Sequence, residues 1–178
     1  MAMTGERQDI IRKGIEGRES ARDPERIKGV TRVDIGAVDG LAFTATLPRE
    51  AGVSITMDEP LERGGTGTGL GPLNHFLAGA GGCLLAQLVK VAIAESLDVH
   101  FTGMNVRGGF RRDVGGGFEH ITQEVHTEGS LSKDDLERLT DRAEGFCYVH
   151  NTLSKAVKMT TVVYLNGEET LRRVSEPS

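Results

Sequence analysis

Apolar and polar positions follow two periods along the chain, and these periods predict short strands separated by longer helices. Within residues 52–57, Val53, Ile55 and Met57 alternate with hydroxyl side chains, which is typical of a half-buried strand. The same reasoning predicts further strands at 29–35, 41–47, 100–110, 117–128 and 158–165. Helices are predicted at 5–20, at 73–97, and from Ser132 to Cys147, with a short helix following in "HNTLSKAV".

The segment 73–97 is apolar on nearly all sides and begins just after Pro72, a residue that suits the first turn of a helix. Gly79, Gly81 and Gly82 weaken it as an isolated helix by roughly 1 kcal/mol each relative to alanine. A helix with this composition is best explained by burial, with the glycines allowing another backbone to come close. We expect no membrane-spanning segment, because no apolar run reaches the length that one needs.

The order of hairpins and helices predicts an α+β protein in which antiparallel pairing is favoured. Ser132 is the expected N-cap of the later helix, and Asp135 completes a capping box with it. We expect residues 1–28 to form an N-terminal helical extension, 29–166 the main domain, and 167–178 a loose polar tail.

Composition narrows the classes of function. The 178 residues suffice for one domain with a sizeable core, and 38% hydrophobic with 26% charged residues is typical of a globular protein. A net charge of −5 argues against nucleic-acid and anionic-membrane partners. The first residues lack the apolar stretch of a secretory signal, so a cytoplasmic location is expected.

The glycine-rich run "RGGTGTG" before Pro72 invites comparison with phosphate-binding loops. The dinucleotide-binding fingerprint requires glycines at i, i+2 and i+5, and no glycine of this run has both partners. A P-loop requires Lys followed by Ser or Thr at the start of the helix, where this chain has Pro-Leu-Asn. The pattern therefore predicts a turn leading into a buried helix rather than a nucleotide site.

The chain has two cysteines, Cys83 and Cys147, and the residues alone leave their role open. Cys83 lies well beyond the first helical turn, so a reactive thiolate there needs a cation from elsewhere in the fold; otherwise Cys83 is a small buried hydrophobe. Cys147 and His150 form a C-x-x-H pair that could contribute to a zinc site. His75 and Cys83 lie about 12 Å and about 80° apart on a helix, so they cannot share that metal.

Two segments carry a family resemblance. "DEPLERGGTGTGLGPLNHFLAGAGGC" resembles the segment leading to the cysteine helix of the OsmC and organic hydroperoxide resistance superfamily, and "FCYVHNTLSKAV" resembles its second-cysteine segment. The resemblance covers residues 29–166 and implies an OsmC-like α+β fold. In that fold, antiparallel sheets surround two central helices in an intertwined homodimer.

The resemblance also implies a chemistry without a metal or a bound cofactor. Active members are thiol peroxidases, in which the first cysteine reduces an organic hydroperoxide and becomes a sulfenic acid. The second cysteine then forms a disulfide with it, and a dithiol or lipoyl-type reductant restores both thiols. Carried over, Cys83 is peroxidatic and Cys147 resolving, and Phe76, Phe146 and Tyr148 are the candidate substrate-binding residues.

The chain also departs from the pattern of the family. Active members place a glutamate after the proline that opens the cysteine helix, where this chain has Leu73, and a proline after the second cysteine, where it has Tyr148. The nearest acidic substitutes for the glutamate are Glu59 and Glu62, and the nearest candidates for the arginine that faces the thiol are Arg26 and Arg32. The alternative to a peroxidase is therefore a weak or inactive dimer of this fold that binds a small apolar ligand or a partner.

Overall fold

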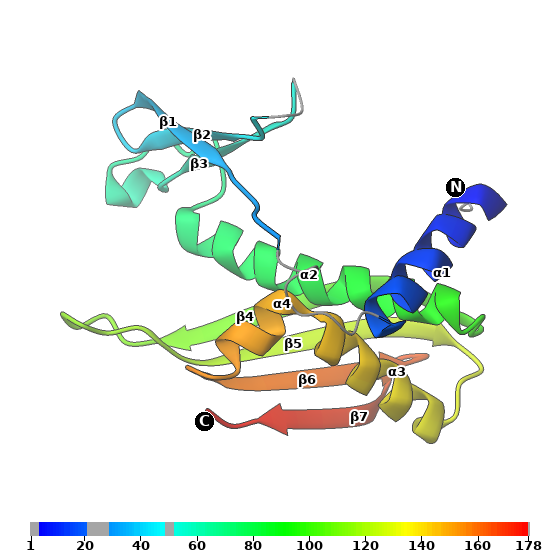
Figure 1. Cartoon of the computed structure of the whole chain (residues 1–178). Coiled ribbons are helices and arrows are strands. Elements are labelled where there is room, and N and C mark those ends of the chain that lie inside the picture. Colours follow the sequence, from blue (N-terminus) through cyan, green and yellow to red (C-terminus); the bar gives the residue numbers. More distant parts are fainter. Residues whose placement is uncertain (1–3, 21–28, 49–51, 178) are drawn as a thin grey trace. The chain divides into compact units, whose positions relative to one another are not determined.

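The computed structural model describes residues 4–20, 29–48 and 52–177, and the chain divides into two units. Residues 21–78 form the small unit, and residues 1–20 together with 79–178 form the large unit. Figure 1 shows the elements of both. Helix α2 (Pro72–Ala94) begins in the small unit, and its remainder from Gly79 belongs to the large unit.

The small unit contains an antiparallel sheet of strands β1 (Asp34–Asp39), β2 (Ala42–Thr46) and β3 (Ser54–Asp58). The predicted turn at Asp39-Gly40 is confirmed, since Gly40 has a φ of 53° between β1 and β2. Strand β3 is also confirmed, but its predicted half-burial is wrong. Val53 and Ile55 are 46% and 51% exposed, because no described segment of the small unit covers their side chains.

The large unit is built on a four-stranded sheet in the order β4-β5-β6-β7. Its strands are β4 (Val99–Phe110), β5 (Phe118–Gly129), β6 (Lys158–Leu165) and β7 (Glu168–Ser175). The preference for antiparallel pairing is wrong for β5 and β6, which run parallel. Two helices connect these strands, and such a crossover returns the chain in the same direction.

The C-terminal segment is not the loose tail that its polarity predicts, because most of it forms β7 and pairs with β6. The two strands are joined by Asn166 and Gly167, whose φ angles of 52° and 87° are both positive. Asn-Gly with two positive φ angles is the signature of a type I′ hairpin turn. Leu171 of this strand is 5% exposed and belongs to the core.

Helix α1 (Gly5–Ser20), the large-unit part of α2, α3 (Lys133–Phe146) and α4 (Tyr148–Leu153) complete the large unit. The predicted capping box of α3 is confirmed: the Ser132 side chain accepts from Asp135 N, and the Asp135 side chain accepts from Ser132 N. Cys147 is both the C-cap of α3 and the N-cap of α4. The second cysteine is therefore fixed by the ends of two helices.

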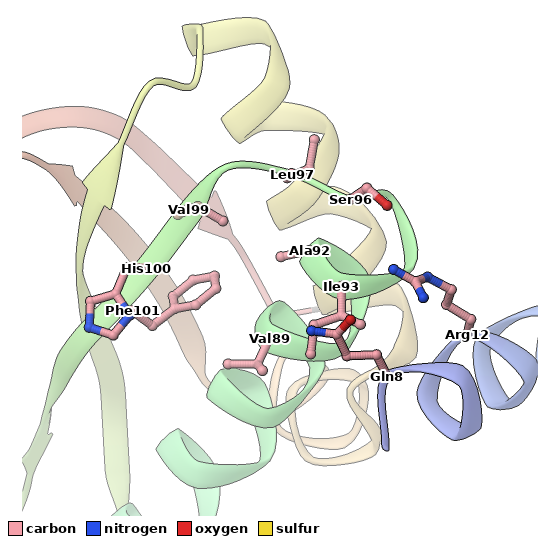
Figure 2. A pocket seen from close by; sticks show the side chains of 10 residues that line it. All are labelled: Gln8, Arg12, Val89, Ala92, Ile93, Ser96, Leu97, Val99, His100 and Phe101. Carbon is pink, nitrogen blue, oxygen red and sulfur yellow. The ribbon is translucent and has the colours of Figure 1, made fainter. Parts of the chain in front are cut away.

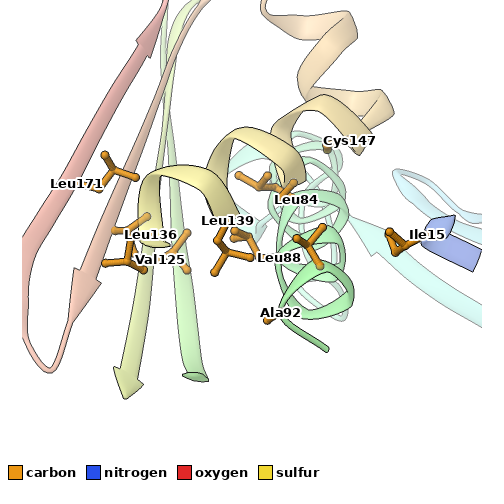
Figure 3. Packing of buried hydrophobic residues seen from close by; sticks show 12 residues of the cluster. Ile15, Leu84, Leu88, Ala92, Val125, Leu136, Leu139, Cys147 and Leu171 are labelled. Atoms are coloured by element: carbon orange, nitrogen blue, oxygen red, sulfur yellow. The ribbon is translucent and has the colours of Figure 1, made fainter. Parts of the chain in front are cut away.

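The core of the large unit lies between its helices and one face of the sheet. Leu84 and Leu88 of α2 meet Leu136 and Leu139 of α3 over Val125 of β5 (Figure 3). Burying each such leucine side chain contributes roughly 1.5–3 kcal/mol. Figure 1 shows that α3, α4 and the large-unit part of α2 lie over the same face of the sheet. This packing positions α2, and with it Cys83.

One of the glycines of α2 allows a close approach within the chain. A Cβ at Gly81 would lie 2.5 Å from Val106 Cγ2 and 3.0 Å from Met104 Sδ, so only glycine lets α2 rest on β4 as it does. A Cβ at Gly79 or Gly82 would meet no described atom within 4 Å. For these two glycines, close packing against another backbone remains a prediction.

The length and hydropathy of α2 bear on the expectation that no segment of the chain spans a membrane. It has 23 residues and a mean hydropathy of 1.8, which is enough by length and composition to cross a membrane. The buried core helix of a globular protein has the same properties, and α2 supplies four of its side chains (Leu84, Leu88, Val91 and Ala92) to the core. Length and hydropathy are therefore weak evidence for a membrane span here.

Candidate active site

The two cysteines, 64 residues apart in the sequence, are in contact. Cys147 Sγ donates to Cys83 Sγ across 3.3 Å. Cys83 comes from the middle of α2 and is partly exposed, whereas Cys147 is fully buried. A disulfide requires the sulfurs to approach to about 2.05 Å, so a small side-chain movement would join them.

The environment of Cys147 keeps its thiol protonated. The pKa of the Cys147 thiol is raised from 9.0 to about 11, chiefly by burial and in smaller part by the contact with Cys83. The backbone N–H of His150 donates to Cys147 Sγ at 3.4 Å and opposes this increase in the pKa. Cys147 is therefore a hydrogen-bond donor to Cys83 at neutral pH, not a thiolate.

Arg18, near the end of α1, is bonded to one residue beside Cys147 and to another on the cysteine helix α2. Its Nη2 donates to the Phe146 carbonyl oxygen at 2.8 Å, one residue before Cys147. Its Nη1 donates to Gln87 Oε1 at 3.3 Å, and Gln87 lies one helical turn beyond Cys83 on α2. These contacts could not be predicted from the sequence, because 128 residues separate Arg18 from Phe146.

Two of the three predicted substrate-binding aromatics surround this arginine. The Arg18 guanidinium carbon lies 4.5 Å from the centre of the Phe146 ring and 4.9 Å from that of Tyr148. Cations over aromatic faces at this range are attracted by the ring quadrupole. Tyr148 is 69% exposed, so the guanidinium and both rings are close to solvent. Phe76, the third predicted aromatic, belongs to the small unit.

Helix α1 is fastened to the rest of the large unit at several points. Ile15 is 3% exposed and joins the core. Arg142 of α3 donates both to Glu19 of α1 and to Glu95, just beyond α2. These ion pairs and the buried isoleucine hold the helix in the position from which Arg18 reaches Phe146.

The predicted candidates for the family's arginine and glutamate belong to the small unit or lie outside the described residues. Arg32 lies in the small unit and pairs with Asp34 at 2.8 Å, and Arg26 lies outside the described residues. Glu59 pairs with Arg63 at 3.6 Å, also in the small unit. Helix α2 has no acidic residue in its first turn, where Leu73 is 43% exposed.

A buried charged cluster lies on the core side of Cys147. Glu144 of α3 is 6% exposed and accepts from Arg173 Nε of β7 at 3.0 Å. His150 of α4 is also 6% exposed, and its Nε2 lies 4.0 Å from Glu144 Oε2. Arg173 Nη2 continues to Asp141 at 2.8 Å. Sequence reasoning missed this cluster, whose members come from three elements.

The glycine-rich loop of the small unit is organised around an internal carboxylate. Asp58 is fully buried, and its side chain accepts from the backbone N–H and the hydroxyl of both Thr66 and Thr68 at 2.6 to 3.1 Å. These bonds lower the pKa of Asp58 from 3.8 to about 2. A Cβ at Gly65 would lie 1.7 Å from Glu59 O, so glycine is required for the chain to pass.

A separate hollow of about 750 Å³ opens in the large unit (Figure 2). Val89 and Ile93 of α2 and Phe101 of β4 form part of its apolar wall, and Gln8 and Arg12 of α1 lie along its rim. Neither cysteine lines it. Its volume is in the range of small-molecule sites, which are commonly about 300–1,000 Å³.

The structure offers no support for the predicted alternative of a zinc site. Within residues 4–20, 29–48 and 52–177, no three His, Cys, Asp or Glu side chains come together in a way that could hold a metal ion. Cys147 and His150 instead contact each other through the sulfur and the backbone nitrogen.

The large unit is an α+β fold in which the partly exposed Cys83 thiol contacts the buried Cys147 thiol. This arrangement places the chain in the class of two-cysteine thiol proteins. Residues 65–162 match the family model of OsmC-like proteins. Because this match covers more than half of the chain, the chain belongs to the OsmC-like family, and the resemblance noted in the sequence is confirmed.

Solved structures show the same fold. An OsmC-like protein from Mycoplasma pneumoniae is 23% identical with a TM-score of 0.66, covering 78% of this chain and 99% of its own. An organic hydroperoxide resistance protein from Legionella pneumophila is 21% identical with a TM-score of 0.57, covering 76% of this chain and 98% of its own. One from Elizabethkingia anophelis is 18% identical with a TM-score of 0.60, covering 79% and 100%. No curated protein matches the chain.

Proposed function

We propose that the protein reduces organic hydroperoxides through Cys83 and closes a Cys83–Cys147 disulfide. The observation that carries the proposal is the 3.3 Å contact between the two sulfurs. Membership of the OsmC-like family and the similarity to organic hydroperoxide resistance proteins support the same chemistry. An organic hydroperoxide and a dithiol or lipoyl-type reductant are the proposed reaction partners, in the cytoplasm.

The steps follow from the positions of the residues. The Cys83 thiolate attacks the terminal peroxide oxygen, the O–O bond breaks, and the alkoxide leaves as an alcohol after taking a proton. Cys83 becomes a sulfenic acid, and Cys147 displaces its hydroxyl as water to form the disulfide. Arg18 is the proposed cation that favours the thiolate, because it bonds Phe146, next to Cys147, and Gln87, one helical turn beyond Cys83. Phe146 and Tyr148 provide aromatic surface for the organic group.

We further propose that the protein works as a homodimer. The small sheet exposes apolar side chains that a second copy could cover: Val33, Ile35, Val53 and Ile55 are all at least 46% exposed. On α2, Gly79, Gly82 and Ala86 form an exposed stripe of small residues. Exposed apolar area of this kind commonly marks an interaction surface.

The test is a reaction of the reduced protein with cumene hydroperoxide, followed by intact mass and free-thiol measurement. We expect rapid loss of both thiols and a mass decrease of about 2 Da for the disulfide, from the loss of two hydrogens. Cys83→Ser should abolish the reaction, and Cys147→Ser should stop it at the sulfenic acid. Survival of both thiols in excess peroxide would overturn the proposal.

The second candidate function is a ligand-binding dimer without peroxidase activity. The hollow beside Val89 and Phe101 favours it, because this site is large and mainly apolar and lies apart from the cysteines. Fluorescence of an anilinonaphthalene sulfonate probe tests this candidate. Binding that is lost in Ile93→Arg but kept in Cys83→Ser supports it, and binding unaffected by Ile93→Arg excludes this hollow.

A further inference from the structure

A glutamine side chain is buried in the apolar core next to the cysteine helix. Gln123 of β5 is 1% exposed and alternates with Ile121 and Val125 on the face of the sheet that the helices cover. Its Nε2 donates to the carbonyl oxygen of Ala80 at 3.1 Å, between residues 43 positions apart. This bond joins the sheet directly to the backbone of α2.

The helix itself does not require this bond. Ala80 lies inside α2, where each carbonyl oxygen accepts from the N–H four residues further on. A buried amide is costly unless both its donor and its acceptor are bonded, and Gln123 Oε1 has no hydrogen-bond partner within the described part of the chain. An apolar side chain of similar shape would avoid that cost. What the amide adds at this position is therefore its hold on α2.

The bonded turn of α2 is the one that leads to Cys83. Ala80 lies one helical turn before Cys83 on the same side of the helix. Gly81, the next residue, rests on β4, since a Cβ there would lie 2.5 Å from Val106 Cγ2. This turn is therefore held by β5 through a hydrogen bond and by β4 through close packing.

Cys147 is fixed separately, through its own backbone and sulfur. Its N–H donates to Glu144 O at 3.0 Å, its carbonyl oxygen accepts from Asn151 N at 2.9 Å, and its sulfur accepts from His150 N at 3.4 Å. A disulfide forms only within narrow limits of distance and side-chain geometry. Because Cys147 is fixed, the 3.3 Å separation of the two sulfurs depends on where α2 holds Cys83.

We propose that Gln123 is a positioning residue for the Cys83–Cys147 disulfide, and that it acts through the backbone of α2 rather than on either sulfur. Its bond to Ala80 restricts the turn that carries Cys83 in the reduced protein. Without the bond this turn gains freedom, which is lost again when the sulfurs join, so the bond raises the effective concentration of one thiol at the other. This inference deepens the proposed function and rests on the disulfide named there.

The experiment compares the disulfide equilibrium of Gln123→Met with that of the unchanged protein in a glutathione redox buffer. Oxidised glutathione takes the two thiol hydrogens and leaves as two molecules of reduced glutathione, so the ratio at equilibrium gives the effective concentration of the pair. We expect Gln123→Met to lower it about tenfold, which raises the reduction potential by about 30 mV. The melting temperature of the reduced protein should not fall, because an apolar side chain of similar shape replaces the buried amide.

Thr161→Val is the matched control. Thr161 of β6 is in register with Gln123, is also 1% exposed, and has no partner for its Oγ1 among the described residues. The change removes a buried polar atom from the same row of the sheet and leaves the bond to Ala80 in place, so the potential should stay at the unchanged value. An equal shift in both variants would assign the effect to core packing and overturn the inference.

Gln123→Leu is the second variant, with the same expected shift, and it decides the question if Gln123→Met does not fold. An unchanged potential in whichever variant folds overturns the inference and leaves the proposed function intact. The equilibrium needs no peroxide, so the two proposals fail separately. A shifted potential in a protein whose thiols survive excess cumene hydroperoxide would overturn the proposed function and keep the positioning role of Gln123.

Discussion

Arg18 Nη2 donates to the carbonyl oxygen of Phe146 at 2.8 Å, which joins α1 to the residue immediately before Cys147. The N-terminal helix lies outside residues 65–162, the part that matches the family model. This chain therefore brings an arginine to the residue before its second cysteine from a segment beyond the matched region.

Arg18→Ala should slow the reaction of Cys83 with cumene hydroperoxide, and with iodoacetamide at pH 7, by about tenfold. A nearby cation favours the thiolate, and tenfold corresponds to about 1.4 kcal/mol. Arg12→Ala is the matched control on the same helix, because Arg12 pairs with Asp9 on the surface. Mass spectrometry follows the rates. Equal rates in the two variants would show that Arg18 does not promote the reaction of Cys83.

Cys147 should resist alkylation in the native protein. With a pKa of about 11 and full burial, it stays a thiol at pH 8, so iodoacetamide should give a single adduct, on Cys83. Denaturant should make both cysteines react. Peptide mapping identifies the modified residue, and preferential labelling of Cys147 in the folded protein would contradict the assignment of roles.

The raised pKa of Cys147 should also make the fold less stable in alkali. In the unfolded chain this thiol loses its proton near pH 9.0, whereas in the folded chain it does so near 11. Between these values the unfolded state binds fewer protons, so rising pH favours unfolding. The melting temperature should fall more steeply from pH 9 to 11 in the reduced protein than in Cys147→Ala, and equal slopes would argue against a buried neutral thiol.

Asp58→Asn should destabilise the small unit at neutral pH but much less in acid. The pKa of Asp58 is about 2 in the folded chain and 3.8 without its partners, so its stabilising effect is complete above pH 4. The effect is lost as the pH falls towards 2, because the carboxylate becomes protonated in the folded state too. Thermal unfolding at several pH values measures the difference between variant and unchanged protein, and a constant difference contradicts the account.

Gly81→Ala and Gly82→Ala form a matched pair on α2. Either change gains roughly 1 kcal/mol of helix propensity, but a Cβ at position 81 collides with Val106 at 2.5 Å while one at 82 meets no described atom. Gly81→Ala should therefore lower the melting temperature. Gly82→Ala should leave the fold intact and weaken dimerisation, measured by sedimentation. A monomeric unchanged protein would overturn the proposed dimer.

Much of the large unit could be predicted from the sequence because its signals are local. The capping box at Ser132 and Asp135 and the alternation around Val125 are each readable within a few residues. The parallel pairing of β5 with β6 is not local, since it depends on how two intervening helices return the chain. The turn residues Asn166 and Gly167 are typical of a hairpin. The polar composition of the strand after them led instead to the prediction of a loose tail.

The residues of the candidate site likewise divide into those that the sequence could identify and those that it could not. Cys83 and Cys147 could be identified because thiols are rare in the chain and their spacing fits a family pattern. Arg18 could not, because arginines are common and its contact with Phe146 joins two helices that are far apart in the sequence. A contact between residues 128 positions apart, such as that of Arg18 with Phe146, leaves no periodic pattern in the sequence.

The loop around Asp58 carries its own anion. A carboxylate eight residues before Thr66 is an intramolecular ligand, and its effective concentration at the loop amides exceeds that of a free anion in solution. Free phosphate would have to displace this tethered group, so the loop behaves as an anion site that is permanently occupied. Its glycines resemble those of a nucleotide-binding loop because both must bend a backbone around a negative charge, and here that charge is part of the chain.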